Sequence, residues 1–227
     1  MKPSVIAVDG PAAAGKSVFA RRLADALGYT FFDSGLLYRA ITWAALQRGI
    51  DPGDEDALAG LTARLKIQVK RAPEGSGYPS HVLIDGRDIT SELFDPKIDA
   101  VVSEVAAHPR VRQELLPLQR KIAQQGHVVI AGRDIGTVVM PNAPLKIFVL
   151  ASPETRARRR YEQLKQRGID VDYDTILADI ERRDRLDSER RVAPLAIAPD
   201  ALVLDTDNMT VDEEIRLVLD RIACADD

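Results

Sequence analysis

Residues 10–17 read Gly10-Pro11-Ala12-Ala13-Ala14-Gly15-Lys16-Ser17 and match the pattern G-x-x-x-x-G-K-[ST] in full. The apolar run of residues 4–9 predicts a buried strand before this loop, and the apolar spacing of residues 15–27 predicts a helix after it. In a strand–loop–helix unit of this kind, glycines let backbone N–H groups turn toward phosphate oxygens, and the helix N-terminus adds partial positive charge. The stretch therefore predicts a loop that binds a triphosphate, and we call it the phosphate loop.

Two side chains of the phosphate loop carry chemistry. The Lys16 ammonium is placed to reach β- and γ-phosphates, and the Ser17 hydroxyl is placed to bind Mg²⁺. A Gly/Ala-rich turn without a ligand is disfavoured, because the strand and the helix both stand where the motif requires them. We expect the ATP-binding residues to be Gly10, Pro11, Ala12, Ala13, Ala14, Gly15, Lys16, Ser17 and Val18.

Short apolar strands alternate with helical patterns along the chain. This alternation predicts an α/β fold in which about five parallel strands form an open sheet covered by helices on both faces. The predicted strands are residues 4–9, 30–32, 127–131, 145–150 and 201–204, and the predicted helices are residues 15–27, 34–47, 96–107, 110–124, 154–167, 174–186 and 211–223. Residues 65–69 and 81–84 alternate in hydrophobicity, which predicts a small antiparallel hairpin, and the turn-rich residues 72–80 between them are expected to be a flexible loop.

Length and composition narrow the class of protein. A chain of 227 residues, 45% of them hydrophobic, suits one globular domain with insertions. A net charge of -4 gives no general attraction to nucleic acid or to an acidic membrane, and no apolar run approaches the ~18 residues of a membrane span. The single cysteine, Cys224, cannot form an internal disulfide, which fits a reducing compartment. We expect a cytoplasmic protein that binds neither nucleic acid nor a membrane.

A second group of residues follows the second predicted strand. Residues 33–39 read Asp-Ser-Gly-Leu-Leu-Tyr-Arg and stand at a carboxyl strand end, where ligands gather in a parallel sheet. Ser34 is a good N-cap for the next helix, and Arg39 is either a surface residue or a ligand of an acceptor's phosphate. The chain lacks the N-K-x-D sequence that GTPases use for guanine. A kinase that needs a second pocket for its acceptor therefore fits better than a GTPase.

Arg133 and Asp134 stand in a glycine-flanked loop, residues 131–137, at the end of another buried strand. Two interpretations are open at this point. The two side chains form a local ion pair that fixes the loop, or they clamp a ligand, with Arg133 on a phosphate and Asp134 accepting from a donor. The position at a strand end favours the clamp.

Arginines are concentrated in the charged helices between residues 154 and 191. Their default interpretation is a solvated, salt-bridged helical pair. The alternative is a mobile lid over the phosphate loop, because cations that close on the moving phosphoryl group are the main catalytic tool of kinases. The arginines concerned are Arg156, Arg158, Arg159, Arg160, Arg182, Arg183, Arg185, Arg190 and Arg191.

Together these segments resemble the bacterial cytidylate kinases. The resemblance covers nearly the whole chain and rests on DGPAAAGKS (9–17), DSGLLYRA (33–40), VSEVAAHPRVR (102–112), AGRDIGTVV (131–139) and RRDRLDSERRVAPL (182–195). It implies a P-loop NTPase fold in one kinase unit, with a core of residues 1–34, 108–152 and 192–227, a monophosphate-binding region of residues 35–107 and a helical lid of residues 153–191. It also implies that ATP phosphorylates CMP or dCMP with Mg²⁺ in pyrimidine nucleotide metabolism, and we expect a monomer.

The resemblance assigns roles to individual residues. It implies that the catalytic residues are Lys16, Arg133, Arg159 and Arg160, the last two facing ATP. It implies that cytosine is recognised by Ser103, Arg110 and Asp134, and that the sugar is held by Ser34, Arg183 and Asp187. The acceptor phosphate would be bound by Arg39, Arg133 and Arg190.

The chemistry of cytosine agrees with the implied base-binding set. The Asp134 carboxylate and the Ser103 hydroxyl can accept from the cytosine amino group, and Arg110 can donate to the cytosine acceptors. Uracil has a carbonyl in place of the amino group, and an unpaired buried polar group costs ~1–3 kcal/mol, so CMP is expected to be preferred over UMP. Two alternatives remain: a phosphate-loop kinase that acts on another small molecule, and a nucleotide-binding switch without transfer activity.

Overall fold

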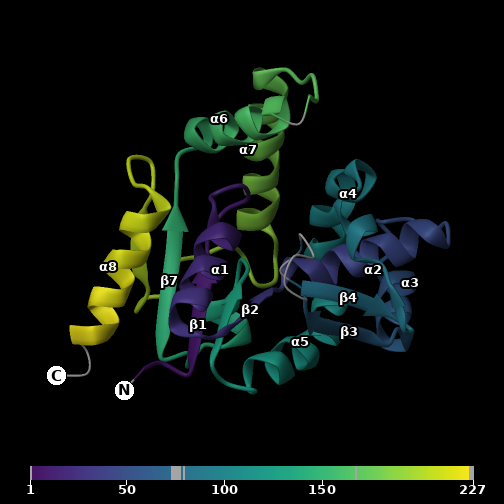
Figure 1. Cartoon of the computed structure of the whole chain (residues 1–227). Helices are drawn as coiled ribbons and strands as arrows, with labels where there is room; N and C mark the ends of the chain where they lie inside the picture. Colours follow the sequence, from purple (N-terminus) through teal and green to yellow (C-terminus); the bar gives the residue numbers. More distant parts are fainter. Residues whose placement is uncertain (1, 73–77, 79, 167, 225–227) are drawn as a thin grey trace.

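The computed structural model describes residues 2–72, 78, 80–166 and 168–224 of the chain. Within these residues, five parallel strands form the central sheet in the order β2–β6–β1–β7–β8, which confirms the predicted fold class. Strand β1 pairs with β6 on one side and β7 on the other, so the phosphate loop emerges at the middle of the sheet (Figure 1). The strands are β1 (Val5–Asp9), β2 (Thr30–Asp33), β6 (Val128–Ala131), β7 (Leu145–Leu150) and β8 (Leu202–Asp205).

Helices cover both faces of the sheet, because successive residues of a strand point to opposite faces. Ile6 and Val8 of β1 pack in a cluster that includes helices α1 and α8. Val5 and Ala7 pack on the opposite face, in a larger cluster that includes helices α2 and α5. The bounds of these helices are α1 (Lys16–Leu27), α2 (Gly35–Gln47), α5 (Pro109–Ala123) and α8 (Val211–Cys224).

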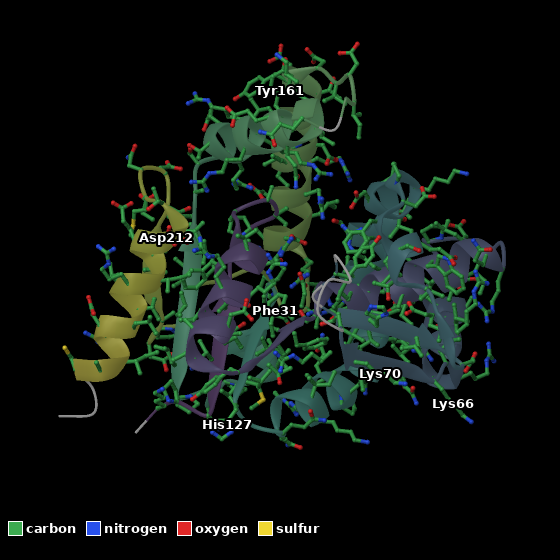
Figure 2. The ribbon with its side chains drawn as sticks, in the orientation of Figure 1. Phe31, Lys66, Lys70, His127, Tyr161 and Asp212 are labelled. Atoms are coloured by element: carbon green, nitrogen blue, oxygen red, sulfur yellow. The ribbon has the colours of Figure 1, made fainter. Side chains whose placement is uncertain are left out.

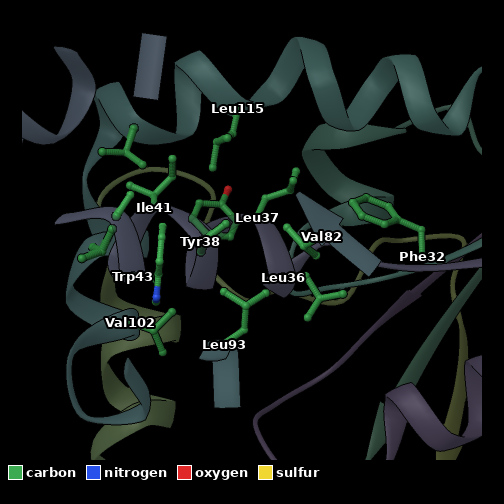
Figure 3. Close-up of a cluster of buried hydrophobic side chains, with 14 of the residues drawn as sticks. Phe32, Leu36, Leu37, Tyr38, Ile41, Trp43, Val82, Leu93, Val102 and Leu115 are labelled. Carbon is green, nitrogen blue, oxygen red and sulfur yellow. The ribbon is translucent and has the colours of Figure 1, made fainter. Parts of the chain in front are cut away.

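The larger cluster fixes α2 beside the end of strand β2. Figure 3 shows Leu37, Tyr38 and Ile41 of α2 facing Leu115 of α5, and all four side chains are buried. Phe32 of β2 belongs to the same cluster. The carboxyl end of β2 and the first turn of α2 are therefore held firmly next to the phosphate loop.

A second, smaller sheet lies beside the main one. The predicted hairpin is present as β3 (Ile67–Arg71) and β4 (Ser80–Ile84), but a third strand, β5 (Arg87–Asp88), extends it. The turn between β4 and β5 is Asp85-Gly86, and both residues have positive φ, at 51° and 88°. Asp-Gly is a strong hairpin signal that the sequence analysis overlooked, because the strand after it has only two residues. Lys66 and Lys70 lie on the outer side of this sheet (Figure 2).

Two helices of this region, α3 (Glu55–Arg64) and the short η1 (Thr90–Phe94), were not predicted. Helix α3 begins after Asp54, whose side chain accepts a hydrogen bond from the backbone of Ala57 at 3.0 Å. The helix packs against α2 and α5 and buries Leu58 and Leu61. It is followed along the chain by the small sheet, η1 and helix α4 (Pro96–Ala107).

Two charged helices project beyond the carboxyl end of β7 as a helical hairpin (Figure 1). They are α6 (Pro153–Gln166) and α7 (Tyr173–Glu189). Their own buried apolar cluster consists of Ala157, Ile176 and Ile180, and Tyr161 lies near their outer end (Figure 2). Helix α7 also contacts α4. The two helices of the hairpin therefore pack mainly on each other, and α7 joins them to α4.

The flexible loop predicted at residues 72–80 lies mostly outside the described residues, because it includes residues 73–77 and 79. Among the residues that the structure does describe, no helix combines the length and the hydrophobicity needed to cross a membrane.

Candidate active site

The phosphate loop leaves β1 through a conformation that demands glycine. Gly10 has φ at 149°, and a Cβ at this position would lie 2.2 Å from the backbone oxygen of Val149. Such a contact is impossible for any side chain, so the loop can follow this path only with glycine. At the other end, the Gly15 oxygen accepts from the backbone of Val18 and Phe19, both at 3.0 Å, and so starts helix α1.

Lys16 is buried and folds back over its own loop. Its Nζ donates to the Pro11 oxygen at 2.5 Å. Burial, and next the positive charge of Arg133, hold the pKa of Lys16 well below its usual value. An anion beside Lys16 would oppose both effects, so the site is built to receive negative charge.

The Ser17 hydroxyl has a carboxylate as its partner. It donates to Asp33 Oδ2 at 2.7 Å, and Asp33 Oδ1 accepts from the backbone of Gly35 at 2.9 Å. Ser17 is a predicted metal ligand, whereas Asp33 was not predicted from the sequence. The available signal was its position as the last residue of β2, at the same sheet edge as the phosphate loop.

Ser34 stands at the N-cap position of α2, as predicted, but its side chain makes no cap hydrogen bond. Its hydroxyl donates instead to the Ala131 oxygen at 2.9 Å, across to the end of β6. Gly132 lies directly against this contact, since a Cβ there would be 2.6 Å from the Ser34 hydroxyl. Ser34 therefore joins the ends of β2 and β6.

Asp9 joins β1 to the loop after β6, and the sequence analysis did not identify it as a site residue. Its carboxylate accepts from the backbone of Ile135 at 2.8 Å and of Gly136 at 2.7 Å. These two residues begin the single-turn π-helix η2 (Ile135–Val139) directly after Arg133 and Asp134. Burial raises the pKa of Asp9 to about 6, although the two backbone donors act to lower it.

This shift predicts a pH dependence of stability. The folded protein binds the Asp9 proton more tightly than the unfolded chain does, so the contribution of Asp9 to stability is largest below the ordinary pKa of 3.8. The contribution falls as pH rises to about 6 and is constant above that, a loss of about 3 kcal/mol in the free energy of unfolding. Nearby Asp134 and Lys16 act on Asp9 in opposite directions.

The measurement is urea unfolding of wild type and Asp9→Asn at several pH values. Because the variant cannot titrate at residue 9, the wild type should lose stability relative to the variant between about pH 4 and pH 6. Curves that stay parallel over this range would show that Asp9 does not titrate there.

Arg133 and Asp134 do not pair with each other, so the local ion-pair interpretation is wrong. Arg133 Nε donates to Asp187 Oδ2 at 2.7 Å, and Asp134 Oδ2 accepts from Arg112 Nη2 at 2.5 Å. Arg190 lies 3.7 Å from a carboxylate oxygen of each aspartate. The loop after β6 thus connects α5 with the end of α7.

The structure places Arg110 outside this cluster. Arg110 is exposed on α5 and pairs with Asp56 at the start of α3, away from this cluster. Arg112, two residues later, is buried and lies with its guanidinium 5.2 Å from the centre of the Tyr38 ring. Arg112 therefore takes the place in the cluster that the sequence analysis gave to Arg110.

The cluster contains two buried arginine nitrogen atoms that lack a hydrogen-bond partner in the part of the chain that the structure describes, although one of them, Arg190 Nη2, lies within ion-pair distance of Asp134. Among the described residues, Arg183 Nε and Arg190 Nη2 are buried and have no hydrogen-bond partner. Burial and Arg133 lower the pKa of Arg183, and burial and Arg112 lower that of Arg190. Burial acts to raise the pKa of Asp187, but Arg133 and Arg190 outweigh burial and hold it below the usual value. An anionic ligand would relieve the crowding of positive charge here.

The arginines of α6 make contacts with different parts of the chain. Arg156, which the sequence analysis left among the general lid charges, is 2% exposed. It donates to the Ala12 oxygen of the phosphate loop and forms a bidentate contact with Asp184 of α7. Arg159 turns the other way and donates to the Thr206 oxygen at 2.5 Å. Arg156 is therefore the residue that ties α6 and α7 to the phosphate loop.

Two predicted ligands of the acceptor stand on α2 and α4. Arg39 of α2 donates to the Leu93 oxygen at 2.9 Å and pairs with Asp99 of α4. Arg160 of α6 lies 3.9 Å from the same carboxylate. Ser103, one turn after Asp99 on α4, is buried. The predicted site residues other than Arg110 thus gather around the carboxyl edge of the sheet and the helices that face it, with Arg159 at the end of β8.

Comparison with known proteins gives a consistent result. A sequence model of the family described as "Cytidylate kinase" matches residues 6–223. A cytidylate kinase of Anoxybacillus flavithermus is 47% identical over 219 residues, covering 96% of this chain and 94% of that protein. One of Mycobacterium avium is 48% identical over 207 residues, covering 91% and 89%. Among solved structures, an uncharacterized protein from Eubacterium ventriosum has a TM-score of 0.53 at 14% identity, over 96% of this chain and 98% of that one, a likeness of fold alone.

Proposed function

The chain belongs to the cytidylate kinase family, and on that premise we propose that it transfers the γ-phosphoryl group of ATP to CMP or dCMP. The products are ADP and CDP or dCDP. The observation that carries the residue assignment is the pair of buried arginine donors, on Arg183 and Arg190, that have no hydrogen-bond partner among the described residues. Arg133 connects them with the phosphate loop, because its charge acts on both Lys16 and Arg183. The phosphate loop and the arginine cluster, both suited to bind anions, therefore meet at one edge of the sheet.

The phosphate loop and its lysine hold the triphosphate. The loop's backbone N–H groups and the N-terminus of α1 favour an anion at this point. Lys16 must leave the Pro11 oxygen, 2.5 Å away, to reach the β- and γ-phosphates. Arg156 already contacts the loop at the Ala12 oxygen. We therefore expect a change in the phosphate loop on ATP binding to be transmitted to α6 and α7 through the contacts of Arg156.

The acceptor is held on the opposite side by residues of helices α2, α4, α5 and α7 and of the segments that follow β2, β6 and α7. We assign recognition of cytosine to Asp134, Ser103 and Arg112, with Arg112 in place of Arg110 because Arg110 pairs with Asp56 on the surface. Recognition of the sugar stays with Ser34, Arg183 and Asp187. The acceptor phosphate is assigned to Arg39, Arg133 and Arg190.

The residues at the start of α1 fit a magnesium ion. Mg²⁺ prefers oxygen ligands and is usually held by one or two protein oxygens together with phosphates and water. The Ser17 hydroxyl and the Asp33 carboxylate, 2.7 Å apart, supply such oxygens at the mouth of the phosphate loop. When bound, the ion neutralises charge on the phosphates.

The protein groups act mainly by position and charge. A phosphate oxygen of CMP attacks the γ-phosphorus in line, and the acceptor needs no dedicated base because it is already an anion. Lys16 and Arg133 lie close enough for the charge of Arg133 to lower the pKa of Lys16, so both can act on the moving phosphoryl group. Residues 153–191 are proposed to close as a lid that excludes water, over a monophosphate-binding region of residues 35–107.

The test of this function is a steady-state assay over CMP, dCMP, UMP, AMP and GMP with coupled detection of ADP. CMP is expected to exceed UMP in kcat/KM by about ten- to a hundredfold, because uracil leaves the buried Asp134 carboxylate facing a carbonyl. Equal kcat/KM for CMP and UMP would contradict the assigned cytosine contacts. ATP binding without turnover on any of the five acceptors would favour a nucleotide-binding switch instead.

We also propose that the enzyme acts as a cytoplasmic monomer whose partners are ATP and CMP or dCMP, with no nucleic acid and no membrane among them. This proposal rests on the chemistry of the substrates, both of which are small soluble nucleotides.

A further inference from the structure

A single carboxylate on α4 lies among arginines from the three parts of the site. Asp99 pairs with Arg39 of α2 and lies 3.9 Å from Nη2 of Arg160 on α6. Its charge also acts on Arg183 of α7, where it opposes the lowering of that pKa by burial and by Arg133. Asp99 thus links the helix that carries the predicted phosphate ligand Arg39 with both helices of the lid.

Arg39 does not depend on Asp99 alone for its position. Its Nη1 donates to the Leu93 oxygen at 2.9 Å, and its guanidinium carbon lies 5.7 Å from the centre of the Phe94 ring. These two contacts hold the guanidinium from the chain just before α4. The Asp99 carboxylate is therefore an additional acceptor on a side chain that is already oriented.

Asp99 stands beside the space that the acceptor must occupy. It lies four residues before Ser103, so the two side chains project from the same face of α4, one turn apart. Ser103 is assigned to the base, and Arg39 to the phosphate, of the same nucleotide. A phosphate on Arg39 consequently comes close to the Asp99 carboxylate, and the two anions repel each other.

We propose that Asp99 is a stand-in for the acceptor phosphate: in the nucleotide-free enzyme it occupies Arg39 and lies 3.9 Å from Arg160, and the phosphate of CMP displaces it from Arg39. This inference rests on the proposed function. The carboxylate and the phosphate compete for the same guanidinium donors, and a dianionic phosphate forms stronger hydrogen bonds than a single carboxylate. Until it is displaced, Asp99 keeps α4 and the lid helix α6 in contact through Arg160.

The inference predicts that removing the charge of Asp99 strengthens CMP binding. By calorimetry at low salt, Asp99→Asn is expected to lower the Kd for CMP by about five- to tenfold, because the repulsion between two close anions is removed. The gain should shrink at high salt, because the Asp99 side chain is 31% exposed and its charge is screened. Asp99→Ala should show the same gain, since Leu93 and Phe94 still orient Arg39.

The matched control is Glu104→Gln, which removes one negative charge from the exposed side of the same helix. It should leave the Kd for CMP unchanged, which separates the local effect of Asp99 from the net charge of the protein. If both Asp99 variants bind CMP as weakly as wild type, or more weakly, the carboxylate is a support for Arg39 and the inference is wrong. A wild-type protein that binds no CMP would overturn the proposed function, and the inference with it.

Discussion

Replacing Lys16 with alanine is expected to lower kcat for CMP phosphorylation by about a thousandfold or more, while the protein still folds. The ammonium is the cation nearest the transferring group in a phosphate loop. Residues 10–19, which form the loop and the first turn of α1, contain no second lysine or arginine that could replace it. Folding should survive because burial already disfavours the charged form of Lys16, as its lowered pKa indicates. The measurement is the coupled ADP assay, with circular dichroism to check the fold.

The matched control for this experiment is Arg21→Ala. Arg21 is exposed on the same helix, so the change removes one positive charge without touching the loop. Its kcat should stay near the wild-type value. A Lys16→Ala protein that keeps full activity would remove the phosphate loop from the mechanism.

The second large effect concerns two arginines of one helix. Arg112→Ala is expected to lower kcat/KM for CMP by about a hundredfold or more, because it removes a charged donor assigned to cytosine. It should also lower the free energy of unfolding, because truncating one partner of a buried ion pair costs about 3–5 kcal/mol. It leaves the buried Asp134 carboxylate with Arg190, 3.7 Å away, as its remaining cation. Arg110→Ala should change kcat/KM by no more than about twofold, since exposed ion pairs contribute little.

Measuring kcat/KM together with the thermal midpoint separates lost recognition from lost stability. Arg112→Ala is expected to reduce both, and Arg112→Lys to restore most of the stability but only part of kcat/KM, since lysine keeps the charge and loses the planar fork. If Arg110→Ala proves as damaging as Arg112→Ala, the assignment made from the sequence was correct and the one made from the structure is not.

The cytosine ligand was predicted from the sequence as Arg110 and is assigned from the structure as Arg112. This difference shows a limit of prediction from the sequence. Both arginines stand in the segment His108-Pro109-Arg110-Val111-Arg112, and nothing in its composition separates them. Residues two positions apart in a helix, such as Arg110 and Arg112, point in directions about 200° apart. If one of them faces a site, the other must face away from it. Only the packing of α5 against α3, α4 and η2 decides which of them is buried.

Ser34 and Asp33 show a related limit. The position of Ser34 before a helix indicates an N-cap, but the hydroxyl donates to Ala131, 97 residues away in the sequence. Asp33 begins the segment of residues 33–39 and has no predicted role there, yet its carboxylate accepts a hydrogen bond from the Ser17 hydroxyl. In both cases the partner comes from another strand end, which a local pattern does not contain.

The sequence by itself determined the phosphate loop, the parallel sheet, the sheet edge at which ligands gather, and the resemblance to one kinase family. These features depend on local periodicity and on residue types at fixed spacing, which a linear chain displays directly. The tertiary structure alone decided the partners within the charge cluster: Arg133 with Asp187, Asp134 with Arg112, Arg156 with Asp184, and Asp99 with Arg39. Those pairs join residues 22 to 60 positions apart, and which charges meet depends on how the helices pack, because many arginines and aspartates are chemically equivalent until burial brings particular ones together.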